Sequence, residues 1–354
     1  MNGIKAAERA LSRERALRLL DETSPDLPWA GARMLGIDIM KLRPGKRLTV
    51  RYTLAMRGEG PSERVLFGKA YGGHGGERVA ALLRAIEASP PDGEQARLRL
   101  PRCLGYNVRR RFLLLDTVKG EALANLLERP DAGARLALFG CALAGFHSLG
   151  GQLAGPLPIG RPPVAGSTAG ARMAIRSHAA SDEAGVVSLA QSVFQSSPLA
   201  PELGEEYGAL AWRVRSLLLE GGRQSMPVSL LHRDLYPDQV LAGKEDFGLV
   251  DLDEAAYGEA ELDVGNFSAH LLLRDMQGRA AVGPGRGQAA AVRVGYEREA
   301  HLDDRRVSVY LAAALVRLAS LERISRSKVS VLAWPALARA LLGEAERALA
   351  GVGP

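Results

Sequence analysis

The 354-residue sequence predicts an α+β fold with two lobes, a small antiparallel β-sheet lobe followed by a larger, mostly helical lobe. The first observation is a series of stretches in which apolar residues alternate, separated by turns such as Pro44-Gly45, which is typical of an antiparallel meander. The second is a change after Gly120 to alanine- and leucine-rich sequence with helical periodicity. With 47% hydrophobic residues, the chain has enough apolar material for a substantial core.

The small lobe is predicted to contain one main helix among its strands. Apolar residues at helical spacing over Ala6–Leu20 predict a helix that ends before Ser24-Pro25. A second helix, from Glu77 to about Ala88, follows the first three strands. The predicted strands are Met34–Leu42, Leu48–Met56, Arg64–Ala70, Arg102–Asn107 and Arg111–Thr117.

The large lobe begins near Val118, so we place the lobes at residues 1–118 and 119–354. A helix is predicted over Ala122–Leu149, and most of the remaining sequence is helical in pattern. The glycine-rich stretch Gly278–Gly287 is predicted to be a loop between helices. The predicted short strands are Val228–Leu231, Val240–Ala242 and Phe247–Leu252.

Composition narrows the class of protein. The net charge is +6, but the basic residues are scattered and aromatic residues make up 5%, which disfavours a nucleic-acid partner. The two cysteines, Cys103 and Cys141, have apolar neighbours and no metal-ligand spacing, so we expect no zinc site and a cytoplasmic location. No uninterrupted run of about 18 apolar residues occurs, so we expect no membrane span.

The stretch from His232 to Gln239 carries residues suited to phosphate transfer. It contains Asp234, and a second carboxylate, Asp251, follows the hydrophobic pair Leu249-Val250. Phosphoryl transfer needs an acceptor hydroxyl held in line, a carboxylate to take its proton and metal ions across the phosphates. We therefore predict that Asp234 is the base and that His232 shapes the loop through hydrogen bonds. Gln239 and Asp251 would hold Mg²⁺, which prefers oxygen ligands.

These motifs resemble the aminoglycoside phosphotransferase and choline kinase branch of the protein-kinase-like fold. That branch shows a His-x-Asp-x-x-x-x-Asn loop, then a hydrophobic strand ending in Asp-x-Asp, then a Gly-Asp-Pro-x-x-Asp-like segment. The corresponding stretches here are residues 232–239, 251–253 and 258–263. The resemblance covers nearly the whole chain and implies an ATP- or GTP-dependent small-molecule kinase. Its N-terminal lobe would bind the nucleotide, and its C-terminal lobe would carry the catalytic loop and the substrate pocket.

The resemblance also implies roles for residues outside the loop. Lys69 would contact the α- and β-phosphates, with Glu77 as its ion-pair partner. Backbone groups near Asp116 and Val118 would hydrogen-bond the base of the nucleotide. The turn at Gly45 would cover the phosphates, with its charge supplied by Arg43, Lys46 or Arg47.

The resemblance also implies a structural role for one aspartate, and several residues of this sequence depart from the expected patterns. Asp263 would be structural and would bind backbone amides of the catalytic loop. Gln239 stands where the family has asparagine, so its amide oxygen is displaced by about one bond length and the metal geometry adjusts. Glu259 and Ala260 replace the usual Asp-Pro, and the turn at Gly45 lacks the glycine-rich pattern of protein kinases.

Three hypotheses about function compete. The first is a small-molecule kinase. The second, a protein kinase, is disfavoured because Asp-Phe-Gly and Ala-Pro-Glu are missing from the second half of the chain. The third is a nucleotide-binding pseudokinase that acts as an interaction module. Loss of Asp234, Asp251 or Lys69 would indicate this last class, and all three are present.

The acceptor stays open among aminoglycosides, other antibiotics, sugars and amino sugars. Tyr236 and Asp238 either contact the substrate or shape the loop, and Asp253 either contacts the metal or supports its ligands. Acidic residues near the site would suit a polycationic acceptor; they are Asp238, Glu254, Glu259 and Glu261. Much of the acceptor pocket is expected from the insertion at about Gly160–Glu220. We expect a monomer or a homodimer.

Overall fold

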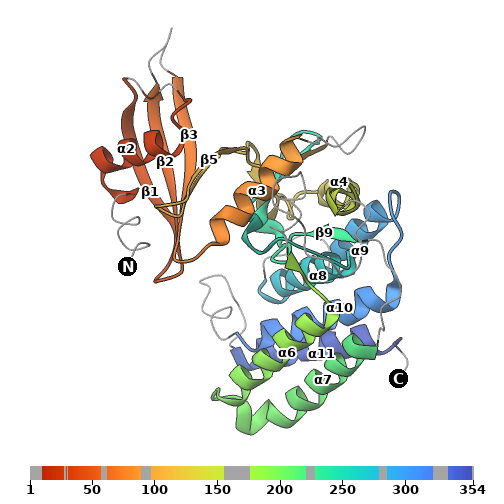
Figure 1. Ribbon diagram of the computed structural model, residues 1–354. Helices are drawn as coiled ribbons and strands as arrows, with labels where there is room; N and C mark the ends of the chain where they lie inside the picture. The colour runs from red at the N-terminus through yellow and green to blue at the C-terminus, as the bar shows by residue number, and fades with distance from the viewer. Residues whose placement is uncertain are drawn as a thin grey trace.

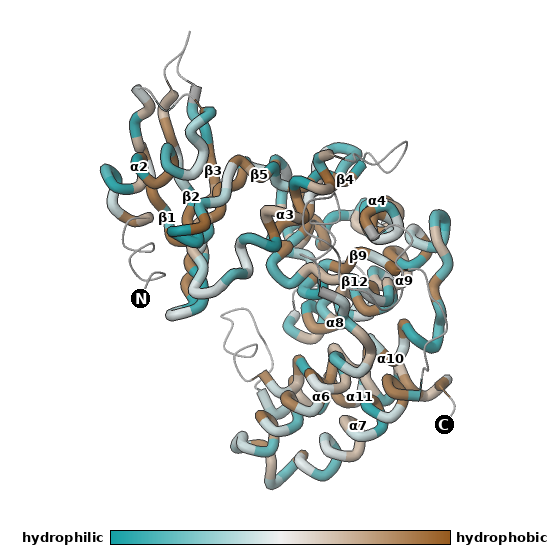
Figure 2. The backbone as a smooth tube through the Cα atoms, in the orientation of Figure 1, coloured by the Kyte–Doolittle hydropathy of each residue, from teal (hydrophilic) through white to brown (hydrophobic). Residues whose placement is uncertain are grey.

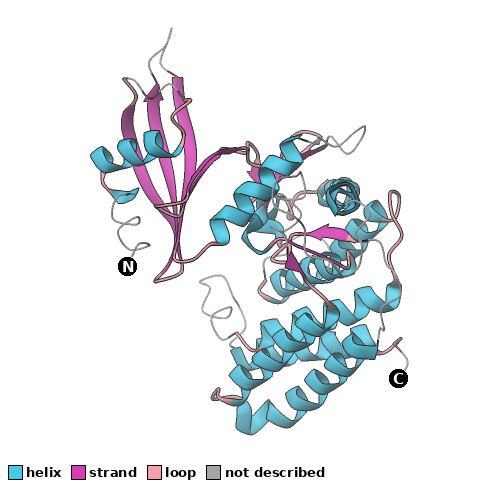
Figure 3. Ribbon diagram, viewed as in Figure 1, coloured by secondary structure: helices cyan, strands magenta, loops and turns pink. Residues whose placement is uncertain are grey.

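The computed structural model contains the two lobes that the sequence predicts, a small antiparallel sheet and a larger helical part (Figure 1). It describes residues 10–27, 29, 31–56, 62–88, 97–154, 176–220, 228–278, 285–321 and 334–352. The long strands gather in the N-terminal part of the chain and the helices in the rest (Figure 3).

A five-stranded antiparallel sheet forms the small lobe. In spatial order its strands are β1 (Arg33–Arg43), β2 (Arg47–Met56), β3 (Ser62–Tyr71), β6 (Phe112–Asp116) and β5 (Cys103–Asn107). Buried residues alternate along β2, because one face of the sheet lies in a core. Figure 2 shows how hydropathy varies along the strands of this sheet. Helix α2 (Arg13–Thr23) covers that face, where its Leu19 and Leu20 share a hydrophobic cluster with Val50 and Tyr52.

The opposite face of the sheet carries polar side chains. Lys41 of β1, Thr49 of β2 and Lys69 of β3 are direct cross-strand neighbours, and directly paired residues lie on the same face of a sheet. Helix α3 (Gly75–Ala88) follows β3, and its Val79 and Leu83 share a hydrophobic cluster with residues of the large lobe. The apolar side of α3 therefore joins the two lobes (Figure 1).

Helices dominate the large lobe and form two hydrophobic clusters. One contains α4 (Ala132–Ala154) and α9 (Gly285–Tyr296), and the other contains α6 (Ala180–Gln195), α7 (Ala200–Glu220), α10 (Asp304–Ala319) and α11 (Trp334–Leu349). Helix α8 (Glu261–Met276) contributes to both clusters through Phe267 and Leu272. The lobe is thus held together around α8, which also begins beside the catalytic loop.

Helix α4 is the one described helix that is long and apolar enough to cross a membrane, over Ala132–Leu153. Within that stretch 56% of the most apolar window is buried inside the protein. Its Leu136, Phe139 and Leu143 are fully enclosed in the hydrophobic cluster. These are the properties of a core helix.

Two small sheets of short strands lie on either side of the loop predicted to be catalytic, residues 232–239. One has the order β4 (Leu98–Arg99), β11 (Phe247–Leu249), β10 (Val240–Ala242) and β7 (Glu121–Ala122), and the other has the order β8 (Arg176–Ser177), β12 (Ala256–Gly258) and β9 (Ser229–Leu231). The loop runs from β9 to β10 and therefore connects the two sheets. Single 3₁₀ turns occur at Leu123–Asn125, Pro237–Gln239 and Leu252–Glu254.

The structure departs from the sequence prediction at three places. Helix α4 begins at Ala132 rather than at Ala122, since Pro130 follows a 3₁₀ turn and cannot continue a helix. Helix α9 begins at Gly285, so the end of the predicted loop Gly278–Gly287 is helical; residues 279–284 lie outside the described residues. The strands β4, β7, β8 and β12 were not predicted, because each has only two or three residues and no alternating pattern.

Candidate active site

A buried aspartate holds the loop between β9 and β10. Asp263, in the first turn of α8, accepts hydrogen bonds from the backbone N–H groups of His232 (2.6 Å) and Arg233 (2.7 Å). His147 Nε2 lies 3.2 Å from the same carboxylate. Burial alone would raise the pKa of Asp263, but the bonds from His147 and His232 lower it below its usual value. Asp263 is therefore an anion enclosed by donors, in the structural position expected from the sequence.

The loop is also tied to the strand that precedes Asp251. His232 Nε2 lies 2.8 Å from the carbonyl oxygen of Val250, so it donates to that oxygen. The backbone of Arg233 and of Asp251 is left-handed, with φ of 67° and 65°, a conformation that costs a non-glycine residue about 1–3 kcal/mol. Surrounding hydrogen bonds therefore fix a strained loop on both sides of the site.

Asp251 and Asp253 face a cluster of basic side chains from the small lobe. Lys69 Nζ lies 2.7 Å from Asp251 Oδ1 and 3.0 Å from Asp253 Oδ1. Lys41 Nζ lies 3.2 Å from Asp251 Oδ2. The Arg47 guanidinium contacts both aspartates, Asp251 at 3.2 Å. The two lobes therefore meet through ion pairs at this point.

The charges of this cluster shift its pKa values in opposite directions. Burial alone would raise the pKa of Asp251, but Lys69, Arg47 and Lys41 hold it well below its usual range. Burial lowers the pKa of Lys69, and Asp251 opposes that shift. An ionised carboxylate is a ligand that suits Mg²⁺.

Gln239 and Tyr236 form a pair on the same loop. Gln239 Nε2 donates to the Tyr236 hydroxyl at 2.9 Å, which leaves Oε1 as the acceptor atom of the amide. The Tyr236 ring stacks on His270 of α8, with centroids 5.1 Å apart. Burial raises the pKa of Tyr236 above its ordinary value, and the nearby carboxylates of Asp234 and Asp251 raise it further. Tyr236 therefore lies within electrostatic range of both Asp234, the predicted base, and Asp251, the predicted metal ligand.

The remaining acidic residues of the site differ in their surroundings. Asp234 is half-buried, and among the described residues its carboxylate has no hydrogen bond or ion pair. Asp238 is exposed. The Glu254 carboxylate lies 3.8 Å from Arg233 and its side chain is 59% exposed. Asp234 and Asp238 are thus carboxylates of the loop that are available to a bound molecule.

Two carboxylates that the sequence placed near the site are structural instead. Glu259 pairs with Arg306, with Nε 2.7 Å away. Glu261 is buried and accepts a hydrogen bond from the backbone N–H of Asp303 at 3.1 Å. Neither carboxylate is free to recognise a polycationic acceptor, so the acidic pocket considered from the sequence loses these two residues.

The connection between the lobes begins where β6 ends. Asp116 pairs with Arg64 at 3.2 Å, and Thr117 Oγ1 donates to the carbonyl oxygen of Val65. Val118 follows outside the sheet, and its backbone makes no backbone hydrogen bond with another described residue. The N–H and C=O groups of Val118 therefore have no backbone partner in the part of the chain that the structure describes.

The turn between β1 and β2 is seated against the end of β3. Gly45 has φ of +70°, which glycine adopts without strain. The N–H of Gly72 donates to the carbonyl oxygen of Lys46 at 2.8 Å. A Cβ at Gly72 would lie 2.2 Å from the carbonyl oxygen of Gly45, so only glycine fits there. This close approach fixes the hairpin that carries Lys41 and Arg47.

The predicted ion pair between Lys69 and Glu77 is absent from the contacts of the described residues. Glu77 lies 3.9 Å from His74 at the start of α3 and is 58% exposed. Lys69 is instead occupied by Asp251 and Asp253. The prediction fails in this structure because the two aspartates satisfy the buried ammonium group from the other lobe.

Sequence reasoning missed two contributors to the cluster. Lys41 was not singled out, and Tyr71 donates from its hydroxyl to Asp253 Oδ1 at 2.8 Å. Arg47 was considered only as a charge on the turn. Alternation along the strand was the sequence feature that could have identified Lys41, because a lysine there interrupts an apolar stretch. In the sheet this position is paired through Thr49 with Lys69.

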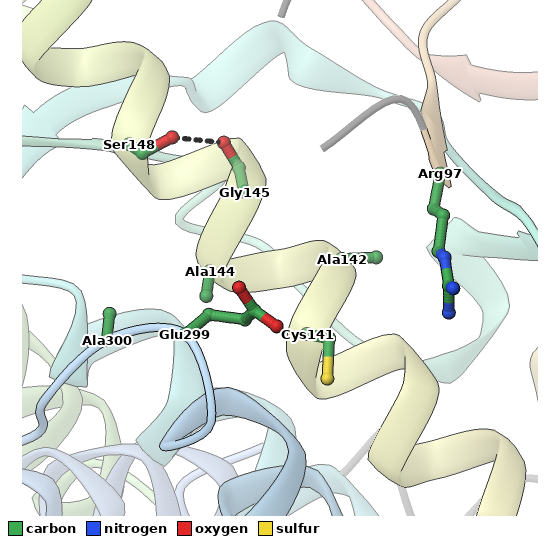
Figure 4. Close-up of a pocket in the computed structure, with 8 residues that line it drawn as sticks. All are labelled: Arg97, Cys141, Ala142, Ala144, Gly145, Ser148, Glu299 and Ala300. Atoms are coloured by element: carbon green, nitrogen blue, oxygen red, sulfur yellow. Dashed lines mark hydrogen bonds between the residues drawn. The ribbon is translucent and has the colours of Figure 1, made fainter. Parts of the chain in front are cut away.

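A separate cavity of about 110 Å³ lies along α4 (Figure 4). Its lining includes Cys141, Gly145 and Ser148 of α4, together with Arg97 and Glu299. None of the predicted catalytic or metal-binding residues lines it. The cavity is therefore distinct from the candidate active site.

Comparison with known proteins gives the family. The model of the phosphotransferase enzyme family matches residues 75–302. No protein of curated function matches the chain.

Solved structures share the fold over nearly the whole chain. Spectinomycin phosphotransferase bound to ADP and spectinomycin has 12% sequence identity, covers 96% of this chain and 98% of its own, and has a TM-score of 0.55. Choline kinase from Cryptosporidium parvum Iowa II has 10% identity, 95% coverage of both chains and a TM-score of 0.61. Amicoumacin kinase bound to AMP-PNP and Ca²⁺ has 12% identity, covers 97% and 96%, and has a TM-score of 0.60.

Proposed function

The chain belongs to the phosphotransferase enzyme family, and we propose that it transfers the γ-phosphate of ATP or GTP to a hydroxyl group of a small molecule with Asp234 as the general base. The observation that carries this proposal is the state of the loop. Asp263 fixes the backbone before Asp234, while the Asp234 carboxylate is left without a partner among the described residues. A held but unpaired carboxylate is what a general base requires.

Asp251 and Gln239 fit the role of magnesium ligands. Asp251 is ionised because Lys69 and Arg47 lower its pKa against the effect of burial. The hydrogen bond from Gln239 Nε2 to Tyr236 leaves the amide oxygen as the donor atom of Gln239. Mg²⁺ is held in kinase sites by one or two carboxylates together with substrate phosphates. When bound, the ion would neutralise charge on the transferred phosphoryl group.

The nucleotide would lie between the sheet and the loop. Lys69 is the buried cation of the sheet face nearest Asp251, a position suited to the α- and β-phosphates. The chain leaves the sheet after Asp116, and the Val118 backbone has no backbone partner among the described residues. We assign the backbone groups of residues 116–118 to hydrogen bonds with the purine base of the nucleotide. Because contacts made by backbone groups do not depend on residue type, the sequence does not separate adenine from guanine, and we propose ATP or GTP.

The acceptor class is proposed from the family and the electrostatics. Aminoglycosides, other antibiotics, sugars and amino sugars all offer hydroxyl groups. Asp238 is exposed beside the loop and Glu254 is mostly exposed, so two carboxylates remain for an acceptor with amino groups. The first part of the expected acceptor pocket, residues 160–175, lies outside the described residues. Residues 176–220 form β8, α6 and α7.

Transfer from labelled nucleotide tests the proposal. The protein is incubated with γ-³²P-labelled ATP or GTP, Mg²⁺ and a panel of aminoglycosides, macrolides, sugars, amino sugars and amino alcohols. With the best acceptor, Asp234→Ala should lower kcat by about 10²–10⁴-fold while the nucleotide Kd stays unchanged. Glu245→Ala is the control, because it removes an exposed carboxylate from the turn after β10. Loss of nucleotide binding by a folded Asp234→Ala protein would contradict the base assignment.

A further inference from the structure

Besides Lys69, the ion-pair cluster around Asp251 and Asp253 contains two further cations, Lys41 and Arg47. Lys41 Nζ lies 3.2 Å from Asp251 Oδ2, and Arg47 contacts both carboxylates. Three cations therefore share two carboxylates. Both oxygens of Asp251 are engaged, Oδ1 by Lys69 and Arg47 and Oδ2 by Lys41 and Arg47.

The position of these two cations follows from the fold. Lys41 ends up beside Lys69 because the two are paired across the sheet through Thr49. Arg47 is the first residue of β2 and is paired with Tyr71, whose hydroxyl also binds Asp253. The hairpin that carries them is anchored at its tip to Gly72. The contacts with Asp251 are thus set by the sheet register.

A metal ion and these two cations cannot occupy the same carboxylate oxygens. Mg²⁺ binds carboxylates at about 2.0–2.1 Å, and Lys41 and Arg47 already lie against both oxygens of Asp251. If they leave, they need another anion, because the Arg47 side chain is only 11% exposed and an unpaired buried charge is costly. Among the described residues, Asp251 and Asp253 are their only ion-pair partners.

We propose that Lys41 and Arg47 exchange partners during nucleotide binding, from Asp251 and Asp253 to the phosphates of the nucleotide. In the nucleotide-free enzyme the two cations exclude divalent metal from Asp251. When the nucleotide enters, its phosphates accept Lys41 and Arg47, and Asp251 is released for the metal. The proposal rests on the proposed function and adds a binding order in which metal enters with the nucleotide rather than before it.

Two binding measurements on the full-length protein test the exchange. The variant is Lys41→Gln/Arg47→Gln, which keeps side-chain length and removes both charges. Free Mn²⁺ is followed by electron paramagnetic resonance without nucleotide, and ADP and adenosine are titrated by calorimetry without metal. The control is Arg33→Gln, an exposed cation at the other end of β1 with no ion pair to another described residue.

The exchange predicts opposite changes in the two measurements. The double variant should bind Mn²⁺ at least about tenfold more tightly than the wild type and should bind ADP at least about tenfold more weakly, because charge-assisted hydrogen bonds to phosphate are stronger than those between neutral groups. Adenosine affinity should not change, and Arg33→Gln should resemble the wild type in all three titrations.

Each other outcome overturns the exchange. Weaker ADP binding without tighter Mn²⁺ binding would make the two residues phosphate ligands that do not guard Asp251. Tighter Mn²⁺ binding with unchanged ADP affinity would remove the phosphates as the second partner. An Arg33→Gln variant that behaves like the double variant would reduce the effect to general charge. If wild-type protein bound neither ATP, GTP nor ADP, the proposed function itself would fail, which is a separate result.

Discussion

Replacing Asp263 with asparagine tests whether one buried carboxylate holds the catalytic loop. Its oxygens accept hydrogen bonds from the N–H groups of His232 (2.6 Å) and Arg233 (2.7 Å), and its side chain is fully buried. Asparagine keeps one acceptor oxygen but turns an NH₂ group toward the other N–H. The loss is one bond to a charged acceptor, about 1.5–3 kcal/mol, and one buried unsatisfied N–H, about 1–3 kcal/mol. We therefore expect the free energy of unfolding to fall by about 2.5–6 kcal/mol.

Equilibrium unfolding in urea at pH 7 measures this loss, with Asp303→Asn as the matched control. Asp303 caps α10 by accepting a hydrogen bond from the N–H of Arg306 at 3.0 Å. Asparagine caps a helix about as well as aspartate, so the control should change by less than about 0.5 kcal/mol. A loss for Asp263→Asn no larger than that of the control would refute the assignment of the loop anchor.

The same carboxylate gives the prediction a pH dependence. The bonds from His147 and His232 outweigh burial and keep the pKa of Asp263 below its ordinary value of 3.8. As the pH falls, the unfolded chain therefore binds this proton before the folded protein does. The stabilisation is complete above the ordinary pKa and is lost below it. The difference between wild type and Asp263→Asn should be constant from pH 5 to 7 and should narrow below about pH 4.

Three further predictions follow from single contacts. Asp251→Asn should abolish Mg²⁺-dependent ATP binding, measured by calorimetry with and without Mg²⁺, and an unchanged difference between the two titrations would contradict the metal role. Gly68→Ala should lower the free energy of unfolding by about 1–3 kcal/mol, because a Cβ there would lie 2.4 Å from the Phe112 ring and 2.7 Å from the Tyr52 ring; an unshifted thermal melting curve would show that the two rings move aside. Burial lowers the pKa of His270 from 6.5 to about 3, so wild-type stability should decline as the pH falls below 6.5, and His270→Phe should flatten that decline in urea titrations at several pH values.

The sequence predicted the parts of the site that are encoded locally. The loop from His232 to Gln239 and the strand before Asp251 were found because their residue types and spacing lie within twenty residues of one another. The two lobes followed from alternation and helical periodicity. The anchor at Asp263 came from the resemblance, and the structure supplies its donors.

The sequence could not predict which charges meet across the cleft. Lys41 and Asp251 are separated by 210 positions, and their contact depends on a strand register and on the seating of one lobe on the other. The expected pair of Lys69 with Glu77 failed for the same reason, because the competing aspartates belong to the other lobe. Local propensity gives no information about such competition.

The departure at Gln239 illustrates how neighbours can offset a changed motif residue. Glutamine has one more rotatable bond than asparagine, so fixing its amide loses more conformational entropy. The hydrogen bond from Gln239 Nε2 to the Tyr236 hydroxyl opposes that freedom. Tyr236 is itself held by its stack on His270. Because this pair fixes the orientation of the amide, glutamine at this position does not by itself favour a pseudokinase over an active phosphotransferase.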